Sequence, residues 1–127
     1  MGVKFLSEEW ARTFTEALNK DDGFKNAAGS QSVKVQQVVN TTEGEKQFYL
    51  KLEGGEVEIG TGEVDAPEAT ITQDYETAVA LYKGELTGTA AYMSGKLKVT
   101  GDLMKLMQMQ GAQAAGQKVH GTLDIEY

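Results

Sequence analysis

The 127-residue chain contains no cysteine, one proline and one histidine. Without cysteine it can form neither a disulfide framework nor a thiolate nucleophile nor a zinc site built on sulfur. A zinc site would have to combine the imidazole of His120 with carboxylates, a poor ligand set, so we predict no metal site. His120 is instead expected to lie on the surface of the C-terminal segment. The lack of cysteine is compatible with a reducing compartment, and we predict a cytoplasmic location.

Basic residues are also scarce: 12 Lys and Arg stand against 19 Asp and Glu, which gives a formal net charge of -7. A nucleic-acid-binding surface or a polybasic membrane patch needs clustered Lys and Arg, so we expect neither. The sequence has no run of about 18 apolar residues that would span a bilayer, and no stable membrane insertion is expected. The length fits a single domain covering residues 1–127.

The chain has little that resembles catalytic machinery. None of its serines lies in a nucleophile elbow, and one histidine would have to serve all of them. Glu56 and Glu58 share a strand face that we expect to be solvated, because Val57 and Ile59 point the other way. Hydrated carboxylates have no reason to shift their pKa values. We therefore predict that the protein is not an enzyme.

The first half of the chain changes from helical to strand periodicity. Ser7 followed by Glu8 and Glu9 is typical of a helix start, and this helix should end near residues 22–23. A weaker helical turn is expected at residues 24–30. Beyond it, apolar and polar residues alternate in three stretches that are joined by short glycine-containing turns. The inward-facing residues of these stretches are Val33, Val35, Phe48, Leu50, Leu52, Val57 and Ile59. We predict an antiparallel meander with one solvated face.

The second half adds two strands and several helices. A fourth strand is predicted at residues 69–72, followed by a helix that Asp74 caps, a short helix at 89–93 and a fifth strand at 96–100. The tail at residues 120–127 is compatible with either another strand or a lid. The order of elements predicts an α+β fold in which a five-stranded, mostly antiparallel sheet carries helices on one face. A ligand would have to lie between the sheet and the helices.

Asp102 is expected to cap a methionine-rich helix that is too apolar for an ordinary surface helix. Its apolar residues spread over an arc of roughly 220°. This arc is much wider than the stripe of about 100° that is enough for a helix to cover a core. These residues are Leu103, Met104, Leu106, Met107 and Met109. Two interpretations remain open: all five belong to the core, or part of the helix contacts a ligand or a protein partner. Methionine suits the second interpretation because its flexible thioether adapts to irregular surfaces.

The central part of the chain resembles a known family. Residues 69–74 and a helix that stops at residues 83–86 are followed by Tyr92-Met93-Ser94-Gly95-Lys96-Leu97-Lys98-Val99-Thr100-Gly101-Asp102 and a Leu/Met helix. This order and spacing are similar to the sterol carrier protein 2 (SCP-2) family. The resemblance implies a five-stranded sheet that is backed by helices and encloses an apolar tunnel for fatty acids, fatty acyl-CoAs, sterols or other lipids. It implies no chemical step and no cofactor.

The chain differs from the eukaryotic carrier because its C-terminus is not a peroxisomal signal, and it resembles a stand-alone, prokaryote-like member. From the inward strand positions and the apolar helix faces we predict a set of tunnel-lining residues. They are Phe48, Leu50, Ile71, Val79, Tyr82, Met93, Leu97, Leu103, Met104, Leu106 and Met107. The expected partner is a lipid or acyl-chain small molecule. The alternative is a protein–protein interaction module or homodimer that uses the methionine-rich helix face.

Overall fold

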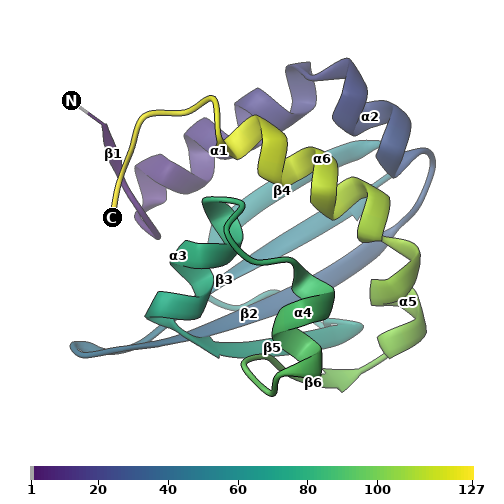
Figure 1. Ribbon diagram of the computed structural model, residues 1–127. Coiled ribbons are helices and arrows are strands. Elements are labelled where there is room, and N and C mark those ends of the chain that lie inside the picture. Colours follow the sequence, from purple (N-terminus) through teal and green to yellow (C-terminus); the bar gives the residue numbers. More distant parts are fainter. Residues whose placement is uncertain (1) are drawn as a thin grey trace.

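A five-stranded sheet forms one layer of the molecule, and the helices cover one of its faces (Figure 1). The structure is a computed structural model that describes residues 2–127. The strands of the sheet are β2 (Val33–Thr41), β3 (Gly44–Glu53), β4 (Glu56–Thr61), β5 (Ala69–Asp74) and β6 (Lys98–Gly101). They lie in the order β4-β3-β2-β5-β6, with β2 and β5 parallel and the other neighbours antiparallel. This arrangement confirms the predicted fold class.

The predicted meander is formed by β2, β3 and β4. The register pairs Val35 with Leu50 and Leu50 with Ile59, so these apolar side chains share the face that the helices cover. Because side chains alternate along a strand, Glu56 and Glu58 point to the opposite face, where both are exposed. Two-residue turns connect the strands, as the glycines at these positions predicted.

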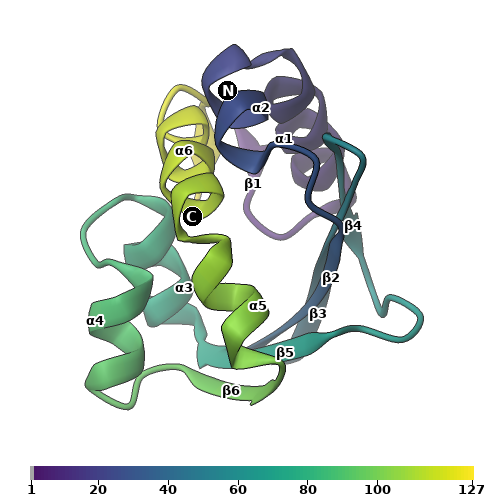
Figure 2. The same cartoon turned by 90° about the vertical axis from the view of Figure 1, so that its right-hand side faces the viewer.

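The connection between β4 and β5 covers part of the sheet's outer face. Because β5 lies beside β2, residues 62–68 must cross both β3 and β2 on the side away from the helices (Figure 2). Gln36 anchors this crossing: its Nε2 donates to the Gly62 carbonyl at 2.9 Å, and its Oε1 accepts from the Val64 N–H at 2.8 Å. The predicted solvated face is therefore wrong around Gln36, which is buried.

The helices are α1 (Glu8–Lys20), α2 (Asp22–Ala28), α3 (Tyr75–Tyr82), α4 (Gly88–Met93), α5 (Leu103–Gln108) and α6 (Gln110–His120). The predicted caps Ser7, Asp74 and Asp102 each accept a hydrogen bond from the backbone N–H three residues further on, at 3.1, 2.8 and 3.1 Å. These bonds satisfy N–H groups that the first helical turn leaves without a partner.

The two ends of the described chain meet at a small separate sheet. Strand β1 (Val3–Lys4) pairs in parallel with β7 (Ile125–Glu126), and Figure 1 shows the two segments side by side. The tail therefore forms a short strand, which resolves the alternative of strand or lid. Its last ring, that of Tyr127, packs 5.1 Å from Phe5 between ring centroids.

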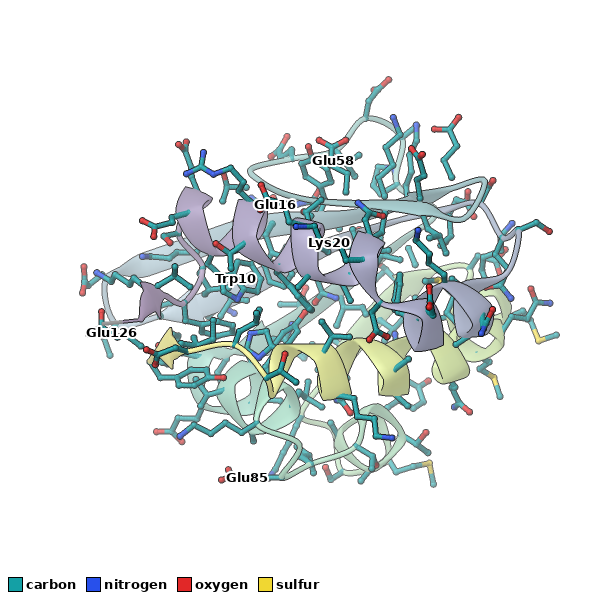
Figure 3. The ribbon with its side chains drawn as sticks, turned by 90° about the horizontal axis from the view of Figure 1, so that it is seen from above. Trp10, Glu16, Lys20, Glu58, Glu85 and Glu126 are labelled. Atoms are coloured by element: carbon teal, nitrogen blue, oxygen red, sulfur yellow. The ribbon has the colours of Figure 1, made fainter. Side chains whose placement is uncertain are left out.

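An aromatic cluster fills the space where α1, α6 and the sheet meet. Its members are Phe5, Trp10, Phe14, Phe48, Tyr82 and His120. Trp10 points between α1 and α6 (Figure 3) and donates from Nε1 to His120 Nε2 at 3.0 Å. His120 is 1% exposed, so the prediction of a surface histidine is wrong. Helix α6 continues to residue 120 and places the ring in the core.

Candidate functional site

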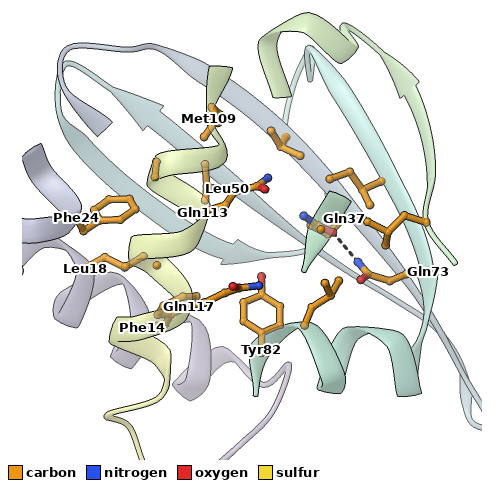
Figure 4. Close-up of a pocket in the computed structure, with 17 residues that line it drawn as sticks. Phe14, Leu18, Phe24, Gln37, Leu50, Gln73, Tyr82, Met109, Gln113 and Gln117 are labelled. Atoms are coloured by element: carbon orange, nitrogen blue, oxygen red, sulfur yellow. Dashed lines mark hydrogen bonds between the residues drawn. The ribbon is translucent and has the colours of Figure 1, made fainter. Parts of the chain in front are cut away.

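An inner chamber of about 110 Å³ lies between the sheet and the helices, beside the aromatic cluster. Its walls come from the inward faces of the strands and from α1, α2, α3, α4 and α6 (Figure 4). The lining residues are Phe14, Leu18, Phe24, Val35, Gln37, Leu50, Ile71, Gln73, Leu81, Tyr82, Gly88, Leu97, Met109, Ala112, Gln113, Gly116 and Gln117. Most of them are apolar, which favours an apolar occupant.

An outer groove of about 410 Å³ lies between α4, β6, α5 and α6. The residues along it are Ile71, Thr87, Gly88, Thr89, Tyr92, Met93, Leu97, Val99, Leu103, Leu106, Met107, Gln110, Gln113, Ala114 and Gln117. Its volume falls within the range of about 300–1,000 Å³ that is typical of small-molecule sites.

The inner chamber and the outer groove adjoin. Ile71 of β5 and Leu97, which precedes β6, line both spaces from the sheet side. Gly88, Gln113 and Gln117 line both from the helix side. Together the two spaces extend from the core of the molecule to the surface near α4 and α5.

One polar pair interrupts the apolar wall of the inner chamber. Gln73 Nε2 donates to Gln37 Oε1 at 2.7 Å, as the dashed line in Figure 4 marks. Gln73 is 4% exposed, and its Oε1 has no hydrogen-bond partner among the described residues. A buried amide oxygen without a partner is unfavourable, so this position calls for a donor.

The walls of both spaces carry no charge at neutral pH. Their lining includes no acidic, basic or histidine side chain, and burial raises the pKa of the Tyr82 hydroxyl so that it stays neutral. Within residues 2–127, no group of three or more His, Asp or Glu side chains is arranged to hold a metal ion. None of the described helices has the length and apolar character needed to cross a membrane.

Most of the predicted tunnel residues line one of these spaces. The inner chamber is lined by Leu50 and Tyr82, the outer groove by Met93, Leu103, Leu106 and Met107, and both spaces by Ile71 and Leu97. Phe48, Val79 and Met104 line neither. Phe48 packs on Trp10 with ring centroids 5.1 Å apart, Val79 is half-buried against the core, and Met104 is 67% exposed. A direct contact of any of these residues with lipid stays a prediction.

Helix α5 contradicts the interpretation that its whole apolar arc belongs to the core. Leu106 is buried, and so is Met109 just after the helix, but Leu103, Met104 and Met107 are exposed. The helix has six residues and buries only Leu106 among them, so the wide arc leaves side chains in solvent.

The sequence interpretation missed the chamber residues of the first helices and the glutamine pair. Phe14 and Leu18 fall within the predicted first helix, but no local signal indicates that their face of the helix borders an empty space. Gln37 and Gln73 did give a signal, since each occupies an inward position after apolar residues at the same strand face. A polar side chain on the buried face of a strand indicates either a hydrogen-bonded core or a ligand site.

The fold and the site together define an α+β protein with an apolar space for a small molecule between its sheet and its helices. The SCP-2 sterol transfer family matches residues 8–114. The chain belongs to this family, which confirms the resemblance seen in the sequence. Family and fold together support a role in lipid binding or transfer.

Two relatives are much longer proteins. Stomatin-like protein 1 of Mus musculus is 36% identical over 69 residues, which cover 54% of this chain and 17% of that protein. Hydroxysteroid dehydrogenase-like protein 2 of Xenopus tropicalis is 29% identical over 104 residues, which cover 79% of this chain and 24% of that protein. The chain thus spans at most about a quarter of the length of these relatives.

Solved structures share the fold at low sequence identity. A crystal structure of sterol carrier protein 2 matches with a TM-score of 0.80 at 21% identity, covering 94% of this chain and 98% of the other. A possible sterol carrier protein from Thermus thermophilus matches with a TM-score of 0.81 at 21% identity, covering 98% and 93%. Palmitated SCP2L2 from Aedes aegypti matches with a TM-score of 0.67 at 21% identity, covering 89% and 95%.

Proposed function

We propose that the protein binds one apolar chain, that of a fatty acid, a fatty acyl-CoA, a sterol or a similar lipid, in a tunnel formed by the inner chamber and the outer groove. The observation that carries this proposal is the set of residues shared by the two spaces, Ile71, Gly88, Leu97, Gln113 and Gln117. The protein would carry or sequester the lipid as a single domain, without a chemical step and without a cofactor. The palmitated relative of the same fold supports an acyl chain as the ligand.

Apolar burial alone is strong enough for such binding. Each buried methylene contributes about 0.8 kcal/mol, so a sixteen-carbon chain offers on the order of 13 kcal/mol before the costs of ordering and association. The uncharged walls therefore need no ionic anchor to hold the chain. A lipid would leave its hydrocarbon part in the two spaces and its headgroup near the mouth of the outer groove or at the glutamine pair.

Flexible side chains border the mouth of the outer groove. Met93 of α4 is 79% exposed and Met107 of α5 is 56% exposed, and both line the groove. Gln110 of α6 donates from Nε2 to Thr89 Oγ1 of α4 at 3.1 Å. This hydrogen bond is exposed, so it can break at little cost when α4 moves to admit a lipid.

Native mass spectrometry of protein purified from cells tests the proposal, with lipid extraction of the same sample. We expect a bound mass that the extract identifies as an acyl-chain lipid. Delipidated protein should also take up a fluorescent fatty acid in a saturable manner. A protein that arrives empty and takes up no fluorescent fatty acid would contradict the proposal.

The alternative of an interaction module or homodimer rests on the exposed methionines, and neither the family nor the similar structures named above support it. Sedimentation of delipidated and lipid-loaded protein distinguishes the two. If the protein is a monomer in both states, the exposed methionines have no role in dimerisation. A dimer that forms through α5 would instead bury Met104 and Met107.

A further inference from the structure

We propose that Gln73, held by Gln37, binds an uncharged hydroxyl group at the inner end of the lipid. This inference rests on the proposed function, because it assigns the orientation and the end-group of the lipid in the same tunnel. The preferred ligand is then a long-chain alcohol or another lipid that ends in a hydroxyl, inserted with that end first.

The glutamine pair belongs to the inner chamber and not to the outer groove. Gln73 and Gln37 line the inner chamber and do not line the outer groove, whereas Ile71, two residues before Gln73 on β5, lines both. A chain that begins at Gln73 would therefore pass Ile71 and Leu97 and continue into the outer groove. The glutamine pair binds the end of the lipid, and the apolar walls contact the rest of its hydrocarbon chain.

The unpartnered oxygen determines the chemistry that fits. Gln73 is 4% exposed and uses its Nε2 on Gln37 Oε1 at 2.7 Å, so its Oε1 remains free to accept. If both amides turn over, the same bond runs from Gln37 to Gln73, and Gln73 then offers an N–H instead. A hydroxyl group both donates and accepts, so it satisfies either orientation, whereas a methyl terminus satisfies neither.

An ionised carboxylate does not fit this position. No Lys, Arg or His lines the inner chamber, and an anion that leaves water without a cation is strongly disfavoured. The carboxylate of a fatty acid would therefore stay at the mouth of the outer groove. A hydroxyl-ended lipid and a fatty acid of equal length should bind in opposite directions.

The test compares hexadecanol with hexadecane, each delivered from cyclodextrin and measured by displacement of a fluorescent fatty acid. We expect wild-type protein to bind hexadecanol about five- to tenfold more tightly, the size of one buried neutral hydrogen bond. Gln73→Met replaces the amide by an apolar group of similar length. This variant should bind both ligands within about twofold of each other.

Gln108→Met is the matched control, because Gln108 is exposed and lines neither the inner chamber nor the outer groove. It should keep the preference for hexadecanol. Equal binding of the two ligands by wild-type protein overturns the inference without using any variant, and so does a preference that survives in Gln73→Met. Either result leaves lipid binding itself intact, whereas failure to bind any of the three ligands contradicts the proposed function as well.

Discussion

At the scale of single residues, the buried histidine makes the stability of the fold depend on pH. His120 accepts from Trp10 Nε1 with its Nε2, and Tyr127 Oη lies 3.5 Å from Nδ1. Desolvation by burial lowers the pKa of His120 from 6.5 to about 4, against the opposing effect of a hydrogen bond with the Tyr82 backbone. The native protein therefore holds this imidazole neutral over a range in which the unfolded chain protonates it.

We predict that the free energy of unfolding decreases as the pH falls from 6.5 toward 4. The contribution of His120 is complete above the unfolded pKa of 6.5, and it is lost progressively as the pH falls to the folded pKa of about 4. The loss amounts to about 3 kcal/mol at most. Urea unfolding at several pH values between 7.5 and 4 measures it.

His120→Gln provides the control for this titration, because the amide oxygen can still accept from Trp10 but does not protonate. Its stability should change less than that of the wild type between pH 6.5 and 4, when only the carboxyl groups still titrate. Parallel curves for the two proteins would mean that His120 has the same pKa in the native and the unfolded state.

The sequence and the structure disagree at His120 for a clear reason. Its partner Trp10 is 110 residues away, and no local pattern around residue 120 indicates that contact. The glutamine pair differs, since Gln37 and Gln73 break the apolar alternation of their own strands and could have been noticed from the sequence. Local periodicity thus marks an exceptional position, but the partner and the cavity depend on tertiary packing.

At the scale of elements, α5 offers two methionines on one short helix with different surroundings. Met107 lines the outer groove and Met104 does not, while both are exposed. We predict that Met107→Asp weakens uptake of a fluorescent fatty acid about tenfold or more, because a charge then faces the hydrocarbon chain. Met104→Asp should change it less than about twofold when the lipid stays within the outer groove, and by as much as Met107→Asp when the predicted contact of Met104 with lipid exists. Both variants should stay folded by circular dichroism, since neither side chain is buried.

Equal losses in the two variants would mean that the lipid covers all of α5, or that charge on this helix acts through the fold. The sequence could predict α5 and its Asp102 cap but not this division of its face. The apolar arc of α5 is continuous in sequence, and only the tertiary placement of the helix decides which of its side chains meet the groove.

Helix α6 contains two glycines, Gly111 and Gly116, and of these only Gly116 lines the inner chamber. Substituting each in turn distinguishes an effect on helix stability from an effect on chamber volume. A Cβ at Gly116 would lie 3.8 Å from Phe24 Cε1 and 3.9 Å from Leu18 Cδ2, which are ordinary contacts. We predict that Gly116→Ala stabilises the protein by about 0.5–1 kcal/mol in urea unfolding. The new methyl group also occupies part of the inner chamber, so the affinity for hexadecanoate should fall.

Gly111→Ala is the comparison, because a Cβ at this position meets nothing within 4 Å and Gly111 does not line either space. It should leave lipid affinity unchanged and raise stability by less, since residue 111 lies in the first turn of α6. A destabilised Gly116→Ala protein would contradict the contact distances around Gly116.

At the scale of the whole molecule, strand periodicity was enough to predict a five-stranded sheet with helices on one face. It did not reveal that β5 inserts beside β2, in parallel, through a connection that crosses the outer face. Nor did it reveal the volume of the two spaces, because the same inward residues build a dry core when they pack more closely. The sequence establishes which residues face inward, and the packing of helices against the sheet establishes how much space they leave.

A lipid that fills both spaces should stabilise the entire fold, because the walls of these spaces come from α1, α2, β2, β3, β5, β6 and every later helix. We predict that hexadecanoate at 100 times its dissociation constant raises the free energy of unfolding by about 2.7 kcal/mol. For a chain of this length that corresponds to a rise in melting temperature of roughly 10 °C over delipidated protein. Octanoate at the same concentration should give almost no shift, because it buries about eight fewer methylenes. Equal shifts for the two acids would place binding outside a space that extends from the chamber to the groove.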